Sequence, residues 1–306
     1  MTSAPPSAGG AEALHAPILS WYAEHARTLP WREPDCTAWG VLVCEVMSQQ
    51  TPVGRIIAPW RAWLQRWPTP ADLAADTPAE AIRMWGGLGY PRRAVRLHEL
   101  ARVLVADFGG EVPQEEATLR TLPGVGEYTA AAVTAFAFGQ RSTVIDTNVR
   151  RVLARALTGR ALPAPALTAA ERRLALDATP IEVTVSATWN VAVMEVGALI
   201  CTARAPRCEQ CPVTDLCAWF RAGRPEEDRP RRPRPGYAGT DRQVRGRILH
   251  LLRTHPQEVA RSASVLPRSA FDDCDPDPTR VDRCLAGLIE DRLVEPVGSG
   301  RYRLPS

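Results

Sequence analysis

A tight turn between two predicted helices, LPGVG at residues 122–126, is the feature that most constrains the fold of this chain. The proline fixes its own φ and has no N–H to donate, while Gly124 and Gly126 can take positive φ and let another backbone approach. The alanine-rich segment Glu127–Phe138 follows and stops before Gly139, which predicts a helix ended by a glycine. The pattern therefore predicts a helix-hairpin-helix, although an ordinary αα-hairpin fits the turn equally well.

Backbone N–H groups beside a helix N-terminus bind anions, and DNA phosphate is the anion that we expect at this turn. Further along, Asp146 stands where an apolar segment leads into another predicted helix. Asp is a favoured N-cap residue, so Asp146 is either a structural cap or a carboxylate that faces a developing positive charge. In the second case the helix dipole is expected to keep Asp146 ionised and to lower its pKa.

Glu45 has the most apolar surroundings of any acidic residue, within VLVCEVM at residues 41–47. Burying a charge there is costly, so we expect the pKa of Glu45 to be raised and the group to carry a proton near neutral pH. The alternative, a Glu on a solvated helix face, is disfavoured by the apolar neighbours. An acid at Glu45 and an anion at Asp146, with separated pKa values, form the pair that glycosidic cleavage requires.

Four of the eight cysteines lie within seventeen residues, in the pattern C-x6-C-x2-C-x5-C. In a cytosolic protein this crowding indicates a metal site rather than disulfides, with zinc and an iron–sulfur cluster as candidates. Structural zinc usually takes two close cysteine pairs, and only Cys208 and Cys211 form one, so the spacing is unusual for zinc while both candidates stay open. The predicted ligands are Cys201, Cys208, Cys211 and Cys217.

All 37 basic residues of the 306-residue chain are arginine. Lysine is absent, which excludes Schiff-base chemistry through a lysine amine. The net charge is only +3, but we expect Arg150, Arg151, Arg204 and Arg207 to form a local basic face for the DNA backbone. No run of residues resembles a membrane span or a signal peptide, so a cytoplasmic protein is expected.

Apolar periodicity predicts an all-α first part, with no strand before residue 222. Its helices are predicted at Pro17–His25, Thr37–Gln50, from Pro52 onwards, near Ala71 and Pro78, at Arg92–Phe108 and Glu127–Phe138, after Asp146, near Ala169, and at Thr184–Ile200. Residues 221–239 are rich in Pro, Arg and Gly and are a predicted linker. A small winged-helix-like module is predicted at 240–306, from helices at Asp241–Arg253 and Thr279–Asp291 and a β-hairpin at Leu293–Leu304 that turns at Gly298–Gly300.

Several motifs together resemble the MutY-type A/G-specific adenine DNA glycosylases, a branch of the helix-hairpin-helix DNA glycosylase superfamily that has an iron–sulfur cluster loop. The motifs are LPWR at 29–32, CEVMSQQT at 44–51, LGY at 88–90, VGEYTA at 125–130, DTNV at 146–149 and the cysteine loop at 201–217. The resemblance covers about residues 15–220. It implies a mainly α fold in which residues 1–220 form the glycosylase region: a six-helix barrel at about 29–140, and a [4Fe–4S] cluster domain made of 1–28 and 141–220.

The resemblance also implies a monomeric, nucleoid-associated DNA repair enzyme that flips and removes adenine mispaired with 8-oxoguanine or guanine in double-stranded DNA. Glu45 matches the acid that protonates adenine at N7, and Asp146 matches the carboxylate that stabilises the oxocarbenium-like sugar. Tyr128 and Asn148 match residues that position these groups. Residues matched to adenine or DNA binding are Trp31, Arg32, Gln49, Gln50, Thr51, Tyr90, Gly124 and Gly126, of which Gln49, Gln50 and Tyr90 would fill or wedge the base stack.

Relatives with lyase activity carry lysine at the position of Tyr128, and this chain has no lysine to replace it. β-Elimination through a lysine Schiff base is therefore excluded, and the expected enzyme is a monofunctional glycosylase.

Three departures from the family pattern concern specificity. Ser48 stands where leucine usually meets the adenine, and Val191 where an amide or acid usually contacts the base. Residues 240–306 are too few for the MutT-like domain that reads 8-oxoguanine in many MutY proteins.

Two other functions compete with this interpretation. A thymine glycosylase for G·T mispairs shares the barrel, the cluster and the tyrosine, but an acid at Glu45 favours adenine because thymine has no N7 to protonate. A non-catalytic iron–sulfur protein that binds DNA would need neither carboxylate, and both are present.

Overall fold

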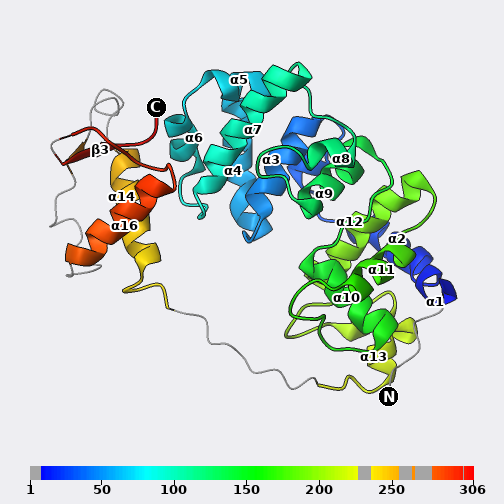
Figure 1. Cartoon of the computed structure of the whole chain (residues 1–306). Helices are drawn as coiled ribbons and strands as arrows, with labels where there is room; N and C mark the ends of the chain where they lie inside the picture. Colours follow the sequence, from blue (N-terminus) through cyan, green and yellow to red (C-terminus); the bar gives the residue numbers. More distant parts are fainter. Residues whose placement is uncertain (1–7, 227–235, 255–263, 266–277, 299) are drawn as a thin grey trace. The chain divides into compact units, whose positions relative to one another are not determined.

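A computed structural model describes residues 8–226, 236–254, 264–265, 278–298 and 300–306 (Figure 1). The chain divides into two compact units. The first comprises residues 1–45, 113–121 and 125–230, and the second comprises residues 46–112, 122–124 and 231–306. Residues 227–235, the middle of the predicted linker, lie outside the described residues. The finer assignment into barrel, cluster domain, linker and module stays a prediction.

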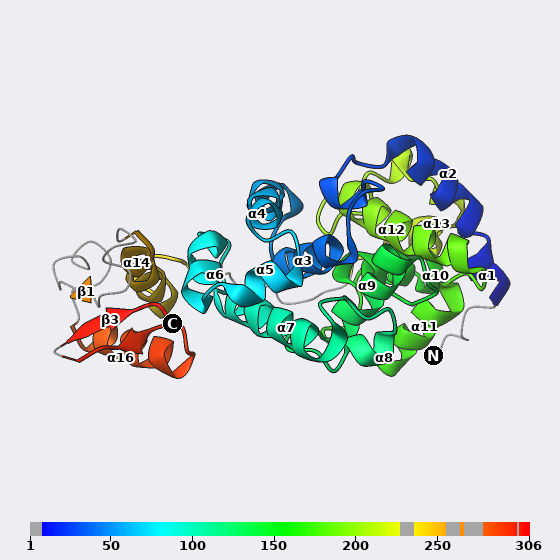
Figure 2. The same ribbon diagram turned by 90° about the horizontal axis from the view of Figure 1, so that it is seen from above.

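In the first unit α12 is the central helix, and α2 and α10 pack along it (Figure 1, Figure 2). Leu14, Ile18, Val152 and Val193 are among the buried side chains between them. The helices of this unit are α1 (Ala8–Glu12), α2 (His15–His25), α8 (Glu116–Leu119), α9 (Glu127–Phe138), α10 (Thr147–Thr158), α11 (Ala169–Ala178), α12 (Val183–Leu199) and α13 (Ala218–Arg221), with 3-10 turns η1 (Pro30–Arg32), η2 (Cys208–Gln210) and η3 (Thr214–Leu216).

Helix α3 (Ala38–Ser48) begins in the first unit and ends in the second. In the second unit α5 and α6 both pack against α7, and α4 packs against α6. Trp63 and Trp85 fill this core almost without exposure, with ring centroids 5.7 Å apart. The helices are α4 (Val53–Arg66), α5 (Pro70–Ala75), α6 (Pro78–Trp85) and α7 (Arg92–Phe108).

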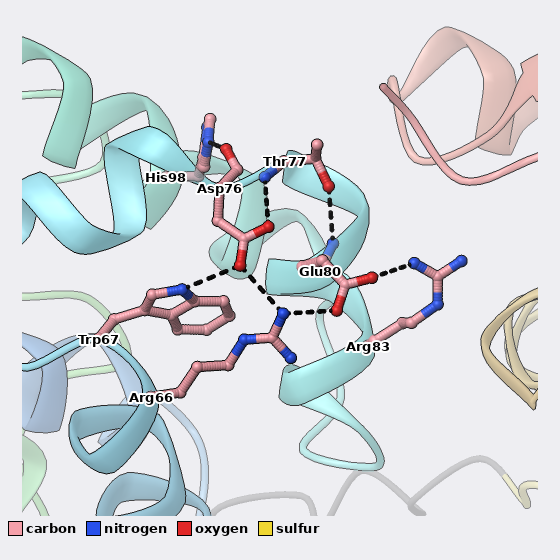
Figure 3. Close-up of polar contacts among 7 residues, drawn as sticks. All are labelled: Arg66, Trp67, Asp76, Thr77, Glu80, Arg83 and His98. Atoms are coloured by element: carbon pink, nitrogen blue, oxygen red, sulfur yellow. Dashed lines mark hydrogen bonds and ion pairs between the residues drawn. The ribbon is translucent and has the colours of Figure 1, made fainter. Parts of the chain in front are cut away.

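A polar network ties the end of α4 to the α5–α6 junction and to α7 (Figure 3). Arg66 Nη2 lies 3.0 Å from Asp76 Oδ2 and 2.7 Å from Glu80 Oε2. The same Asp76 oxygen accepts a bond from Trp67 Nε1 at 3.1 Å, and the Asp76 carbonyl lies 2.8 Å from His98 Nε2. Because several half-buried charges share partners, the network can hold these helices together more firmly than an isolated surface ion pair would.

The C-terminal part of the second unit contains two helices packed on each other and a small antiparallel sheet, the elements expected of a winged-helix-like module. The helices are α14 (Asp241–Thr254) and α16 (Pro278–Glu290). The strands have the order β1-β3-β2, with β1 (Ser264–Val265), β2 (Glu295–Pro296) and β3 (Arg301–Arg303). The predicted hairpin is confirmed, with positive φ at Gly298 and Gly300, while β1 was missed because two residues carry no detectable alternation.

The sequence located most helices well. Helices α7 and α9 have the predicted bounds, and no strand occurs among residues 8–226. Helix α3 ends at Ser48, two residues early, because Gln50 takes a φ of 54° that no helix accommodates. None of the described helices is both long and apolar enough to span a membrane.

The turn at residues 122–126 corrects one prediction. Gly124 has a φ of 78°, but Gly126 has a φ of −92° and an extended backbone that any residue can adopt. An added Cβ at Gly124 would lie 3.3 Å from Arg96 Cβ, so the close neighbour is a side chain and not the backbone that the sequence predicted. Only one of the two glycines is therefore required by the backbone conformation.

Candidate active site and cysteine loop

Glu45 lies on α3 among buried neighbours and is itself only 7% exposed. Burial raises the pKa of its carboxyl to about 7, against a smaller opposite effect of a hydrogen bond with Tyr128. The negative charge of Asp146 also contributes to the increase. The prediction of a high pKa for this carboxyl is confirmed, and Glu45 can hold a proton near neutral pH.

Tyr128 is the second residue of α9, directly after the turn. Its hydroxyl donates a hydrogen bond to the Glu45 carboxylate. Burial raises the pKa of Tyr128 well above its usual value, with further increases from the charges of Glu45 and Asp146. Tyr128 is therefore a neutral phenol that donates to the carboxyl.

Asp146 is the N-cap of α10, as predicted from its position. Its Oδ1 accepts from the Val149 backbone N–H at 2.6 Å, and its Oδ2 accepts from Asn148 Nδ2 at 2.7 Å. The predicted direction of its pKa was wrong. Burial raises the pKa of Asp146 because loss of hydration outweighs the hydrogen bonds from Val149 and Asn148 and the positive charge of Arg151, which all favour the carboxylate.

Asn148 is held from its other side by Arg151. The Arg151 guanidinium donates to Asn148 Oδ1 at 2.8 Å and to the carbonyls of Gly197 and Cys201 at 2.5 and 2.6 Å. Gly197 on α12 lies against Asn148 so closely that an added Cβ would be 2.6 Å from Asn148 Cβ. The side chain that supports Asp146 is thus fixed by one buried arginine and one close helix contact.

The predicted basic face is only partly correct. Arg151 is 8% exposed and is engaged inside the protein, and Arg150 lies 2.7 Å from Glu171 in an ion pair. Arg204 and Arg207 are exposed in the cysteine loop and remain available to DNA. Of the four predicted arginines, the pair on α10 is therefore engaged inside the protein, and the pair in the cysteine loop is exposed.

Arg32 belongs to an ion-pair cluster around Glu195, which the sequence analysis missed. Glu195 is 1% exposed on α12 and accepts bonds from Arg27 at 2.6 and 2.8 Å and from Arg32 Nη2 at 3.0 Å. Burial alone would raise the pKa of Glu195, but the bonds from Arg27 and Arg32 lower it to about 2. Glu195 could have been found by the rule that identified Glu45, because it is an acid within an apolar helix. Trp31 is half-buried beside this cluster in η1.

In the second unit, Gln49, Gln50 and Tyr90 lie around Arg93, which was not among the predicted site residues. Arg93 is 7% exposed and donates to the Gln49 carbonyl at 2.6 Å and to the Gly89 carbonyl at 3.1 Å. Tyr90 is 57% exposed with a φ of 48°, and Gln50 is also exposed with positive φ. Arg93 thus joins the two turns that carry these side chains. The positive φ of two non-glycine residues indicates backbone strain in both turns.

Thr51 is not accessible in the way that a DNA-binding side chain requires. It is 8% exposed, and its hydroxyl lies 3.3 Å from both the Gln49 carbonyl and Arg93 Nη2. The structure therefore uses Thr51 to hold the turn after α3.

The four cysteines of the loop surround a cavity of about 20 Å³ that is also lined by Arg155 and Trp219. Arg155 is 3% exposed, donates to Cys201 Sγ at 3.2 Å, and stacks over the Trp219 ring at 4.6 Å. Four thiols around one cavity with a buried cation beside them suit a thiolate-bound cluster, because the arginine offsets negative charge on the sulfur atoms.

Comparisons with known proteins identify the family of the chain. Residues 43–175 match the HhH-GPD superfamily of base excision DNA repair proteins, and residues 201–217 match the iron–sulfur binding domain of endonuclease III. The adenine DNA glycosylase of Mycobacterium tuberculosis is 46% identical over 94% of this chain and 92% of its own length. That of Mycolicibacterium smegmatis is 47% identical over 94% of each chain.

A solved thermostable thymine-DNA glycosylase covers 70% of this chain and 98% of its own, with 28% identity and a TM-score of 0.63. The fold therefore serves more than one base, while the greater identity and coverage are with the adenine enzymes. The cofactor of this chain is a [4Fe–4S] cluster. The chain belongs to the adenine DNA glycosylases, within the HhH-GPD superfamily of base excision DNA repair proteins.

Proposed function

We propose that this enzyme removes adenine mispaired with 8-oxoguanine or guanine in duplex DNA, as a monofunctional glycosylase. We also propose that it works as a monomer on cytoplasmic DNA. The observation that carries the proposal is the group formed by Glu45, Tyr128 and Asp146. It combines an acid with a pKa of about 7, a neutral donor and a second carboxylate in one buried place.

The first step is proton transfer to a flipped adenine. With a pKa of about 7, roughly half of Glu45 is protonated at neutral pH, and this form can protonate the purine at N7. Protonation lets adenine leave as a neutral base. The Tyr128 hydroxyl then stabilises the carboxylate that remains, because it donates a hydrogen bond to that form.

The second step is stabilisation of the sugar cation. Asp146 would face the oxocarbenium-like carbon, and it gains stability as an anion when that positive charge develops. Asn148 and the Val149 N–H hold both of its oxygens, so the carboxylate need not reorganise. Glu45, now ionised, would remove a proton from the water that attacks the sugar.

Adenine recognition is proposed to involve Trp31 and Arg32. Glu195 stays ionised, with a pKa of about 2, and fixes Arg27 and Arg32. A fixed guanidinium can present its remaining N–H groups to a base edge at small entropic cost.

We further propose that Cys201, Cys208, Cys211 and Cys217 hold the cluster. The cluster would order the loop that exposes Arg204 and Arg207 to the phosphate backbone.

The absence of lysine supports a monofunctional reaction. A phenol at Tyr128 cannot form the Schiff base that opens the sugar for β-elimination. The DNA strand should therefore remain intact after the base has left.

One experiment tests the substrate, and it uses duplexes that contain A·8-oxoG, A·G or G·T. We expect free adenine from the first two and strand breakage only after alkali treatment. Borohydride should trap no covalent complex. Removal of thymine from G·T without removal of adenine would support the thymine glycosylase alternative and refute the proposal.

A further inference from the structure

A cationic groove of about 1000 Å³ lies in the second unit. Its lining includes seven arginines and a single acid, Asp291, so the lining carries an excess of six positive charges. Residues 49–55 and 86–96 form one wall, and α14 and α16 form the other. The groove therefore unites the turns that carry Gln50 and Tyr90 with the C-terminal part of the chain.

Polar contacts hold the two walls together. Arg92 Nη1 lies 3.2 Å from Asp291 Oδ1, and Arg245 forms an ion pair with the other oxygen of the same carboxylate. Arg253 donates to the Gly86 carbonyl. Arg92 at the start of α7 and Arg253 on α14 thus link the two walls, while Arg245 ties α14 to Asp291 within one wall.

Arg93 is buried beneath the turns that it joins. The other three arginines of the lining have no acidic partner in the groove, because Asp291 is engaged by Arg92 and Arg245. Arg55, Arg96 and Arg242 are exposed. Arg242 lies over the ring of Tyr237, with 5.1 Å between its Cζ and the ring centroid. An arginine stacked on an aromatic ring keeps its N–H edge free to meet a phosphate.

Small residues on α14 and α16 make room for these side chains. An added Cβ at Gly246 would lie 3.2 Å from the Tyr237 hydroxyl, and one at Gly287 would lie 2.7 Å from Arg245 Nη1. The surface of this part of the chain is thus shaped to hold an aromatic ring and a guanidinium at the groove.

We propose that the C-terminal part of the chain is a DNA-binding module, in which α14 contributes Arg242 to the phosphate backbone beside the mispair. The proposal rests on the proposed function, because Gln50 and Tyr90, which are expected to wedge the base stack of the bound DNA, line the same groove. Phosphate is the ligand that a groove with this charge and few acids favours, and such contacts position DNA without reading its sequence. The module would thereby add affinity for every duplex.

The test compares the full-length protein with two groove variants, Arg242→Gln and Arg96→Gln, one from each wall. Arg301→Gln is the matched control, since Arg301 is exposed on β3 and does not line the groove. Binding to an undamaged duplex is followed by fluorescence anisotropy at several salt concentrations. Thermal unfolding and circular dichroism verify that each variant is folded.

Each groove variant should lower the slope of log affinity against log salt by roughly 0.9, and should weaken binding roughly 2- to 5-fold at physiological salt. Arg301→Gln should change neither. Groove variants that match the control would overturn the inference. An unchanged DNA slope together with lost binding of a polyglutamate peptide would assign the groove to an acidic protein, which also overturns it.

Undamaged duplex separates the two proposals, because its binding requires no excision. If the groove variants have reduced salt slopes but the wild-type protein releases no adenine, the DNA-binding role of the groove stands and the proposed function is refuted.

Discussion

Gly197 on α12 lies against Asn148 at the start of α10 with no room for a side chain between them. A Cβ on Gly197 would be 2.6 Å from Asn148 Cβ and 3.1 Å from its Cα. The Gly197 carbonyl also accepts from Arg151, which holds the Asn148 amide. A glycine within a helix, here in the last turn of α12, is unfavourable by itself, so its presence reflects the close contact with Asn148.

Replacement of Gly197 with Ala should therefore displace Asn148 and the carboxylate of Asp146 that it supports. We expect single-turnover adenine release to slow by roughly 10- to 100-fold, because small misplacements of catalytic groups are costly. Stability should fall by about 1–3 kcal/mol, as overpacking usually costs. Gly54→Ala is the control, since a Cβ at Gly54 in α4 meets nothing within 4 Å. Equal rates of adenine release for Gly197→Ala and Gly54→Ala would show that Gly197 does not position Asn148.

Glu45→Gln should bind the A·8-oxoG duplex and release no adenine. The amide has nearly the shape of the acid but cannot supply a proton, and a general acid is typically worth ~10²- to 10⁴-fold in rate. Quench-flow measurement of free adenine with enzyme in excess gives the rate. Glu33→Gln changes an exposed acid and should behave like the wild type. A wild-type rate for Glu45→Gln would show that another group is the acid.

Tyr128→Phe should shift the pH dependence of the reaction. The reactive form of Glu45 is protonated, so the wild-type rate should fall as pH rises through about 7. The rate should also fall at low pH, where the Asp146 carboxylate takes up a proton. The hydrogen bond from Tyr128 lowers the pKa of Glu45, and its removal should move the fall in rate to higher pH. Single-turnover rates between pH 5 and 9 provide the measurement. A shift to lower pH would contradict the assigned hydrogen bond.

The purified protein should be brown and contain about four iron atoms per chain. Cys208→Ser should lower the iron content and weaken DNA binding through the loop that carries Arg204 and Arg207. Iron analysis and a visible absorbance spectrum check this, with Cys36→Ser as the control because Cys36 lies outside the loop. Stoichiometric zinc in a colourless preparation would rule out the cluster.

Local patterns in the sequence were sufficient to predict most of the helices and the raised pKa of Glu45. The period of α7, the glycine after α9 and the apolar neighbours of Glu45 all act within a few residues. The helix N-terminus at Asp146 was also local, but the pKa of that group depends on burial by segments far away in sequence.

The other errors have the same origin. Gly197 and Asn148 are 49 positions apart, and the Arg27–Glu195 pair is separated by 168. Arg150 and Arg151 are adjacent in sequence, and only the packing of α10 shows that neither one is free for DNA. Contacts between distant helices have no signature in a single sequence.

The packing of Cys208 would make folding of the cysteine loop depend on the supply of iron. This residue is buried with Ala161 and Trp219 in a small core of its own, so a ligand of the proposed cluster is also part of the packed interior. Newly synthesised chains could not complete that interior before iron and sulfide arrive, and the unfinished loop would expose apolar surface to proteases. Mutation rates during iron starvation would then rise through loss of the protein itself, at unchanged levels of its messenger RNA.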